Sequence, residues 1–164
     1  MIDYPFLLHP RQLWTVCSLF FVIAAPFLML GQLVDSRQLS GANVWTKPFK
    51  FALSFSMHLY TFSLAANELP SSVQDQGWFR VAELASVSAA VLEFAYILIQ
   101  AGRARHSHFN VKSPFERIMD ALMGLGALFL LMPAVLIGLA VALDSTLHWA
   151  NSVRVGVASV VLSS

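Results

Sequence analysis

Two ionisable side chains lie in the middle of neighbouring apolar segments. His58 is within segment 49–66 and Glu93 is within segment 80–100. Such a group at the centre of a bilayer costs about 2.5–3.5 kcal/mol on insertion scales, so it usually faces the protein interior and pairs with another polar group. An imidazole beside a carboxyl group can share a proton with it. The two residues therefore predict a proton-carrying or solute-binding centre inside a membrane.

Other polar residues follow these two at helical spacing, with about 3.6 residues per turn. They predict a polar seam between two antiparallel helices, in which His58 and Glu93 have similar depth. Lys47 and Gln100 would line one mouth of the seam, and Glu68 and Glu83 the other. The members of the seam are Ser54, His58, Thr61, Glu83, Ser86, Glu93 and Gln100.

Three interpretations of the seam stay open. Polar side chains between membrane helices often act only as hydrogen-bonding glue, worth about 0.6 kcal/mol on average. The seam could instead form a path for protons or ions, or bind a cofactor or solute. We predict movement of protons or a small solute, with a non-catalytic assembly subunit and a haem or metal protein as the alternatives.

A basic, histidine-containing region flanks the seam. It consists of Lys47, Lys50, Arg103, Arg105, His106 and His108. Histidines two residues apart could ligate a metal from an extended backbone, but no nearby Cys or Asp completes a ligand set. The alternative is a segment that holds the helix end against anionic lipid.

No cofactor is predicted, although a haem or metal stays open. A b-type haem needs two axial ligands, and His58 is the only histidine at mid-membrane depth, so a haem would require a dimer or a longer chain. The sequence contains no nucleophile elbow, phosphate-binding loop or H-E-x-x-H zinc motif. It therefore gives no support for a hydrolase or a nucleotide enzyme.

The segments that must position these residues belong to a membrane protein. The chain has 57% hydrophobic and 12% charged residues and a mean hydropathy of +0.68. These values predict one all-α transmembrane bundle, since a helix needs about 20 apolar residues to cross a bilayer. The four predicted spans are 13–34, 49–66, 80–100 and 118–143.

An apolar tail, 153–162, is too short to span. It lies along the surface or is the first half of a fifth span, and we expect a longer parent chain.

The basic residues predict the orientation. Seven lie in the loops at one end of the four spans and three at the other, which places the first set in the cytoplasm and the N-terminus outside a bacterial inner membrane. No basic patch indicates nucleic-acid binding. Trp14 and Trp78 are expected in the outer aromatic belt. The first set is Arg37, Lys47, Lys50, Arg103, Arg105, Lys112 and Arg117.

The last span carries two further signals. Ser113 and Glu116 predict a capping box at its start. Ala134, Gly138 and Ala142 form a ladder of small residues, on which a helix of the same or another protein could pack closely. Incidental small residues in an Ala-rich span are the alternative.

Two loop segments carry a resemblance. The stretches Asn43-Val-Trp-Thr-Lys-Pro-Phe-Lys-Phe51 and Gln100-Ala-Gly-Arg-Ala-Arg-His-Ser-His-Phe-Asn110 resemble those of a family of uncharacterised bacterial multi-pass inner-membrane proteins. The resemblance covers the middle of the chain and implies no catalytic role. It implies that the two stretches form a shared cytoplasmic feature and that the relatives are longer.

Overall fold

The computed structural model describes residues 12–107 and 114–143. Four long helices, one short helix and a two-stranded hairpin make up this part of the chain. In order they are α1 (Gln12–Val34), β1 (Gln38–Leu39), β2 (Ala42–Asn43), α2 (Thr46–Asn67), α3 (Ser71–Gln74), α4 (Gly77–Gly102) and α5 (Pro114–Leu143). The four helices predicted as spans are therefore present, each extended by one to four residues at one or both ends, whereas the hairpin and α3 were not predicted.

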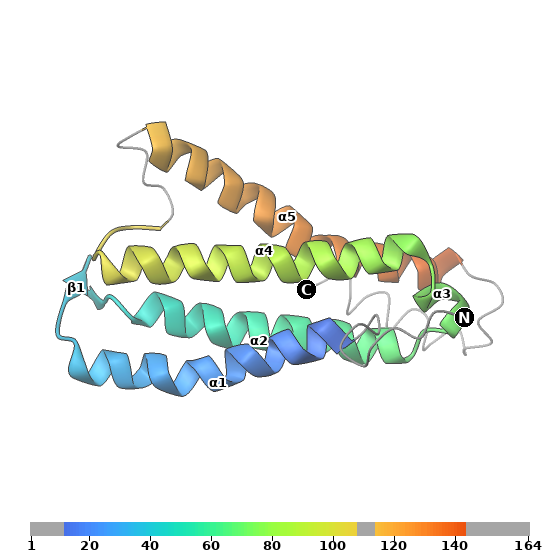
Figure 1. The fold of residues 1–164 in the computed structure, drawn as a ribbon, viewed down its shortest axis with the longest axis horizontal. Coiled ribbons are helices and arrows are strands. Elements are labelled where there is room, and N and C mark those ends of the chain that lie inside the picture. The colour runs from blue at the N-terminus through green and yellow to red at the C-terminus, as the bar shows by residue number, and fades with distance from the viewer. Residues whose placement is uncertain (1–11, 108–113, 144–164) are drawn as a thin grey trace.

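The helices α1, α2 and α4 run side by side, and α5 crosses α4 (Figure 1). The helices α2 and α4 each contact the other three long helices. Large apolar side chains fill the space between them, among them Phe21, Phe62 and Ile137, each at most 1% exposed. In Figure 1 the N-terminal half of α5 leans away from α4. The helix contains Pro133, and proline is a residue that kinks helices.

The hairpin joins α1 to α2 at one end of the bundle. Its turn residues Ser40 and Gly41 have φ angles of 53° and 81°, as a tight hairpin turn requires. Arg37 donates a hydrogen bond from Nη1 to the Gly102 carbonyl oxygen at 2.9 Å, and this bond ties the loop to the end of α4. The start of α2 at Thr46, with Pro48 in its first turn, follows the expected preference of proline for that position.

Three helices, α1, α4 and α5, are long and apolar enough to cross a membrane, and they indicate an integral membrane protein. Their outward side chains are apolar, with Leu92 71% and Phe27 68% exposed, as expected for groups that face lipid. The helix α2 is not among the three. Its polar residues, Ser56 and Ser63 among them, lower its hydropathy, although Met57 and Leu64 on its outer side are exposed and apolar.

The small residues of α5 are buried within the chain itself. Ala134 is 4% exposed and belongs to the main hydrophobic core, and Gly138 is buried as well. In the described residues these two positions therefore pack within the chain itself, and association with a partner through this face stays a prediction. The side chain of Ala142, the capping residue Ser113 and the tail 153–162 lie outside the described residues.

Candidate functional site

The predicted polar face of α4 is buried along its whole length. Glu83 and Ser86 are 0% exposed, Gln100 is 2% and Glu93 is 6% exposed. Helical spacing predicted that these residues share a face, and all four are buried. The face does not have one environment, however, because its two ends contact different helices.

The predicted stripe on α2 lies at the edge of that helix's buried face. Ser54 is exposed, whereas His58 and Thr61 are partly buried. The Thr61 hydroxyl donates to the Met57 carbonyl oxygen of its own helix at 2.8 Å. Of the predicted stripe, only His58 makes a specified hydrogen bond to another helix.

The buried polar groups of α2 are two serines that the spacing argument missed. The Ser18 hydroxyl donates to the Ser56 carbonyl oxygen at 2.9 Å, and the Thr15 and Ser63 hydroxyls are 2.5 Å apart. These contacts join α1 to α2 at two levels. Serine is common on both faces of membrane helices, so the sequence offered no signal for them.

The Glu83 carboxylate caps the start of α1. Its Oε1 accepts the backbone N–H of Leu13 at 3.1 Å, its Oε2 lies 2.6 Å from Nη1 of Arg80, and Trp14 also donates a backbone hydrogen bond to it. The first N–H groups of a helix have no partner within the helix, so a neighbouring carboxylate stabilises them and the helix dipole. Glu83 is thus a structural group. It does not line an open mouth of the seam, which is the position that the sequence predicted.

Trp14 closes the same end of the bundle. It is 0% exposed, its Nε1–H donates to the Ser86 hydroxyl at 2.9 Å, and its ring lies 5.5 Å from those of Phe62 and Phe79. The expectation that Trp14 belongs to an interfacial belt is therefore wrong. Its partner is 72 residues away, and a single sequence gives no indication of such a contact.

The middle of the seam has a different arrangement, because α2 and α4 both meet α5 there. His58 Nε2 lies 3.1 Å from the Leu130 carbonyl oxygen. A Cβ placed on Gly126 would lie 3.8 Å from Oε2 of Glu93. Gly126 and Leu130 are one helical turn apart, so the carboxylate and the histidine meet α5 at successive turns. No hydrogen bond between His58 and Glu93 is specified among the described residues, and their predicted pairing stays a prediction.

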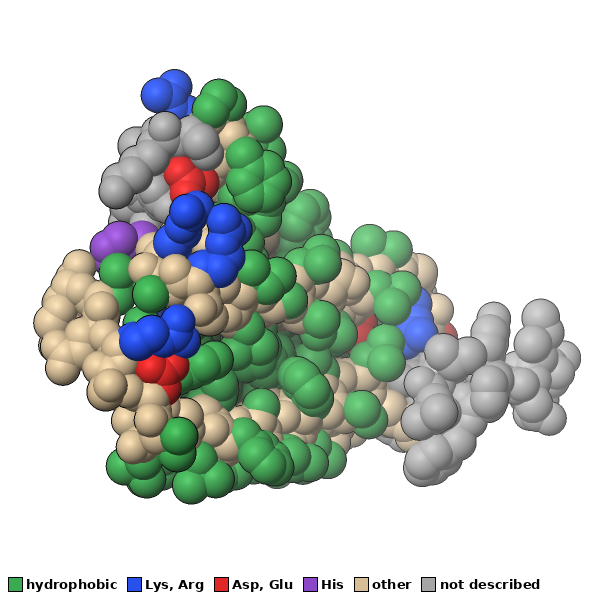
Figure 2. Space-filling model, turned by 60° about the vertical axis from the view of Figure 1, so that its left-hand side comes forward, with side chains coloured by type: hydrophobic (Ala, Val, Ile, Leu, Met, Phe, Trp, Pro, Cys, Tyr) green, Lys and Arg blue, Asp and Glu red, His purple; other side chains and the backbone are tan. Residues whose placement is uncertain are grey.

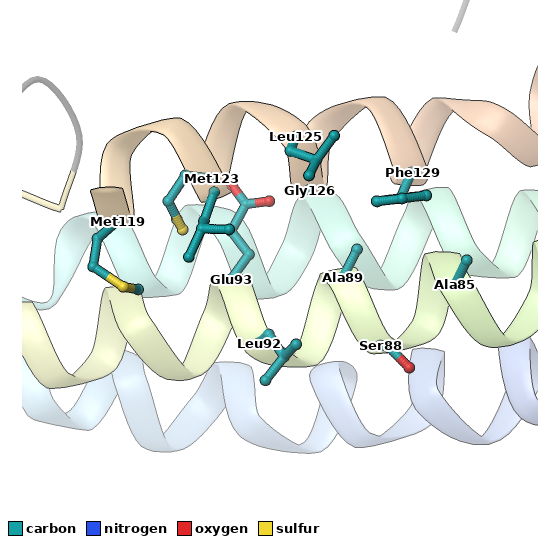
Figure 3. A pocket seen from close by; sticks show the side chains of 11 residues that line it. Ala85, Ser88, Ala89, Leu92, Glu93, Met119, Met123, Leu125, Gly126 and Phe129 are labelled. Carbon is teal, nitrogen blue, oxygen red and sulfur yellow. The ribbon is translucent and has the colours of Figure 1, made fainter. Parts of the chain in front are cut away.

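A groove between α4 and α5 runs past Glu93 (Figure 3). Its volume is about 500 Å³, and its walls are mainly apolar. In Figure 3 the Glu93 carboxyl group rises from α4 toward α5, between Met123 and Gly126. Among the described residues of the lining, Ser88 is the only other one with a polar side chain. The groove therefore combines an apolar wall with one ionisable group.

Lys47 links this groove to one end of the bundle. Its ammonium group has favourable electrostatic interactions with Glu93 and Asp120. Its Nζ lies 5.5 Å from the centre of the Phe51 ring. Lys47 also lines two cavities at the hairpin end. Polar groups therefore extend from mid-groove to that surface.

The predicted basic region gathers at the hairpin end, where Figure 2 shows blue side chains together. His106 Nε2 lies 3.3 Å from the Ser40 hydroxyl, and Arg105 Nη1 lies 3.9 Å from Oε1 of the buried Glu116. Arg103 and Lys50 are exposed. His108 lies outside the described residues, so the predicted pair of histidines is not described.

Gln100, the last residue of the seam, is buried near the same end. Its amide nitrogen donates to the Tyr96 hydroxyl at 2.8 Å. Its Oε1 is buried and accepts no hydrogen bond from the described residues.

An ion pair orders the hairpin itself. The Arg37 guanidinium and backbone N–H, together with Trp45 Nε1–H, hold the pKa of the Asp35 carboxyl well below its usual range. The Arg37 Nη2 to Asp35 Oδ2 distance is 2.7 Å, and the Trp45 Nε1 to Oδ2 distance is 2.8 Å. The same pairing raises the pKa of Arg37.

Within residues 12–107 and 114–143, no three His, Cys, Asp or Glu side chains are grouped so that they could hold a metal ion. What the arrangement provides is a carboxylate in an apolar groove, with a lysine between it and the hairpin end. Such a site can hold a proton or a small cation. Comparison of the chain with protein-family models, with curated proteins and with solved structures gives no match.

Proposed function

We propose that the protein binds a small apolar solute that carries a cationic or protonatable group, and that Glu93 exchanges this solute for a proton. The supporting observation is the groove of about 500 Å³ with a single carboxylate in an apolar wall. A carboxyl group is neutral with its proton and attracts a cation without it. The apolar wall would hold the body of the solute, and the carboxylate would select its charge.

Exchange of the solute for a proton is more favourable at the hairpin end of the bundle than at the opposite end. Toward the hairpin end, Glu93 attracts Lys47, and Lys47 lines cavities there. Toward the opposite end, Trp14, Phe62 and Phe79 are at most 1% exposed and Glu83 is fully hydrogen-bonded and buried. The proton and the solute would therefore exchange on the hairpin side, and the contacts of Trp14 would have to open for passage to the other side.

For this function we propose that all four long helices span the membrane. With 22 residues, α2 is about 33 Å long at 1.5 Å per residue, enough to cross the hydrocarbon core beside its neighbours. The described basic residues other than Arg80 lie at the hairpin end, so the positive-inside rule would place this end in the cytoplasm and the N-terminus outside.

The test uses the full chain purified in detergent, with tetraphenylphosphonium as the cationic probe. Equilibrium dialysis measures binding, and a pH indicator in weak buffer measures the protons released. Wild type is expected to bind the probe with release of protons. Glu93→Gln is expected to bind at least about tenfold more weakly and to release none, because the charge that attracts the probe is gone.

Two further variants separate binding from folding. Glu68→Gln removes the same charge at an exposed position far from the groove and should leave binding unchanged. Gly126→Leu places a side chain beside Glu93 and should block the groove, while leucine favours a helix more than glycine does. Probe binding and proteoliposome proton flux that are both unchanged in Glu93→Gln would show that the seam is structural glue.

A further inference from the structure

A second cavity lies at the hairpin end, outside the groove. Its volume is about 300 Å³, at the lower limit of small-molecule sites, which span about 300–1,000 Å³. The hairpin forms one wall and the first turns of α2 form another, and His106 reaches it from the segment after α4. A smaller cavity of about 50 Å³ adjoins it and adds Arg105 and Ser107 to the lining.

The ionisable side chains in the described lining of the larger cavity are all basic. Lys47, Lys50 and His106 line it, and its described lining includes no carboxylate. Of the carboxylates nearby, Asp35 pairs with Arg37 and Glu116 lies near Arg105. Glu93 and Asp120 interact with Lys47 from outside the lining of the cavity. Lys50 is exposed and has no carboxylate within 4.0 Å among the described residues. The cavity therefore offers cationic groups to an external anion.

The start of α2 adds to this field. Thr46 and Lys47, its first two residues, both line the cavity. The first turn contains no acidic residue, and the N-cap residue Trp45 makes no side-chain hydrogen bond to it. The partial positive charge of the helix start is therefore left for a ligand, and phosphate is the anion that such a start, combined with lysines, commonly binds.

We infer that this cavity binds a phosphate group through Lys47, Lys50 and His106. The cavity lies at one end of apolar helices, where phospholipid headgroups would be located, so either a lipid phosphodiester or a soluble phosphate could supply the group. Lys50 and His106 do not line the groove, so variants at these two positions test this proposal apart from the proposed function, whereas Lys47 belongs to both.

The experiment has one arm for each source of phosphate. The full chain is placed in nanodiscs of phosphatidylcholine alone or with one-fifth phosphatidylglycerol, and native mass spectrometry counts the retained anionic lipids. In the second arm, inorganic phosphate is titrated into the phosphatidylcholine sample and bound phosphate is followed by ³¹P NMR. Saturable, one-to-one binding of at least one of the two is expected.

Matched variants test the position. Lys50→Gln should weaken binding about tenfold by removing a charge-assisted contact, and His106→Gln should weaken it less. Arg103→Gln removes one exposed positive charge at the same end but outside the cavity lining, and should change binding less than twofold. Equal losses in Lys50→Gln and Arg103→Gln, or binding of neither phosphate source by wild type, would overturn the proposal. Retention of phosphatidylglycerol alone would identify a lipid headgroup site, and retention of phosphate alone would identify a soluble ligand.

Discussion

Each half of the polar face of α4 carries a buried glutamate, but the two glutamates have different surroundings. Around Glu83 and Ser86, each specified contact is a hydrogen bond or ion pair within the protein, and Trp14 covers them. Around Glu93, the neighbours are an apolar groove and a glycine of α5. A buried carboxylate that caps a helix contributes to folding, whereas one at the wall of a groove can still meet a ligand. The same helical spacing therefore accompanies a structural role at one end and the site that we propose at the other.

The largest expected effect is on Glu83. Glu83→Ala removes the cap of α1 and leaves Arg80 without its ion-pair partner, which should cost about 3 kcal/mol of stability, at the low end for a buried pair because the Arg80 side chain is 27% exposed. Unfolding of the detergent-solubilised protein measures the loss. Glu93→Gln should lower stability far less, and equal losses in the two variants would contradict the distinction between the two ends.

The contact between Trp14 and Ser86 should have a smaller effect. Trp14→Phe keeps most ring contacts but removes the Nε1–H donor, and we expect a loss of about 1 kcal/mol. Ser86→Ala should cost a similar amount, and the double variant should cost less than the sum of the two. Strictly additive losses would show that the hydrogen bond contributes nothing to α1 packing.

His58 should contribute less than Trp14 to stability. His58→Leu removes the hydrogen bond to the Leu130 carbonyl oxygen but keeps apolar contact with Phe62, so a loss of about 0.6 kcal/mol is expected. Unfolding measures this loss, and the probe assay shows whether His58 also affects Glu93. A large loss of stability without any change in probe binding would show that His58 has a structural role, like Glu83, and no role in binding.

The smallest expected effect is the pH dependence of the contribution that Asp35 in the hairpin loop makes to stability. Because the pKa of Asp35 is lowered in the folded protein, its contribution is complete above its ordinary value of about 3.9 and decreases as the pH falls below that value. The difference in unfolding temperature between wild type and Asp35→Asn should be constant at pH 5–7 and shrink below about pH 4. A difference that does not change down to pH 3 would contradict this role for Asp35.

The sequence by itself determined the four long helices, the buried face of α4 and the clustering of positive charge at one end. Apolar runs of about 20 residues and helical spacing are local properties, and the helix boundaries followed to within a few residues. The small residues of α5 were also recognised as a packing surface, although the sequence could not say that the surface serves the chain itself.

Only the tertiary structure decided which polar residues share an environment. Glu83 and Glu93 are alike in spacing and burial, and what separates them is the helix that each one meets, α1 for Glu83 and α5 for Glu93. The lean of α5 away from α4 opens the groove, and the capping of α1 closes the opposite end. Contacts between residues 70 or more positions apart depend on how helices cross, and a periodic pattern carries no information about the crossing.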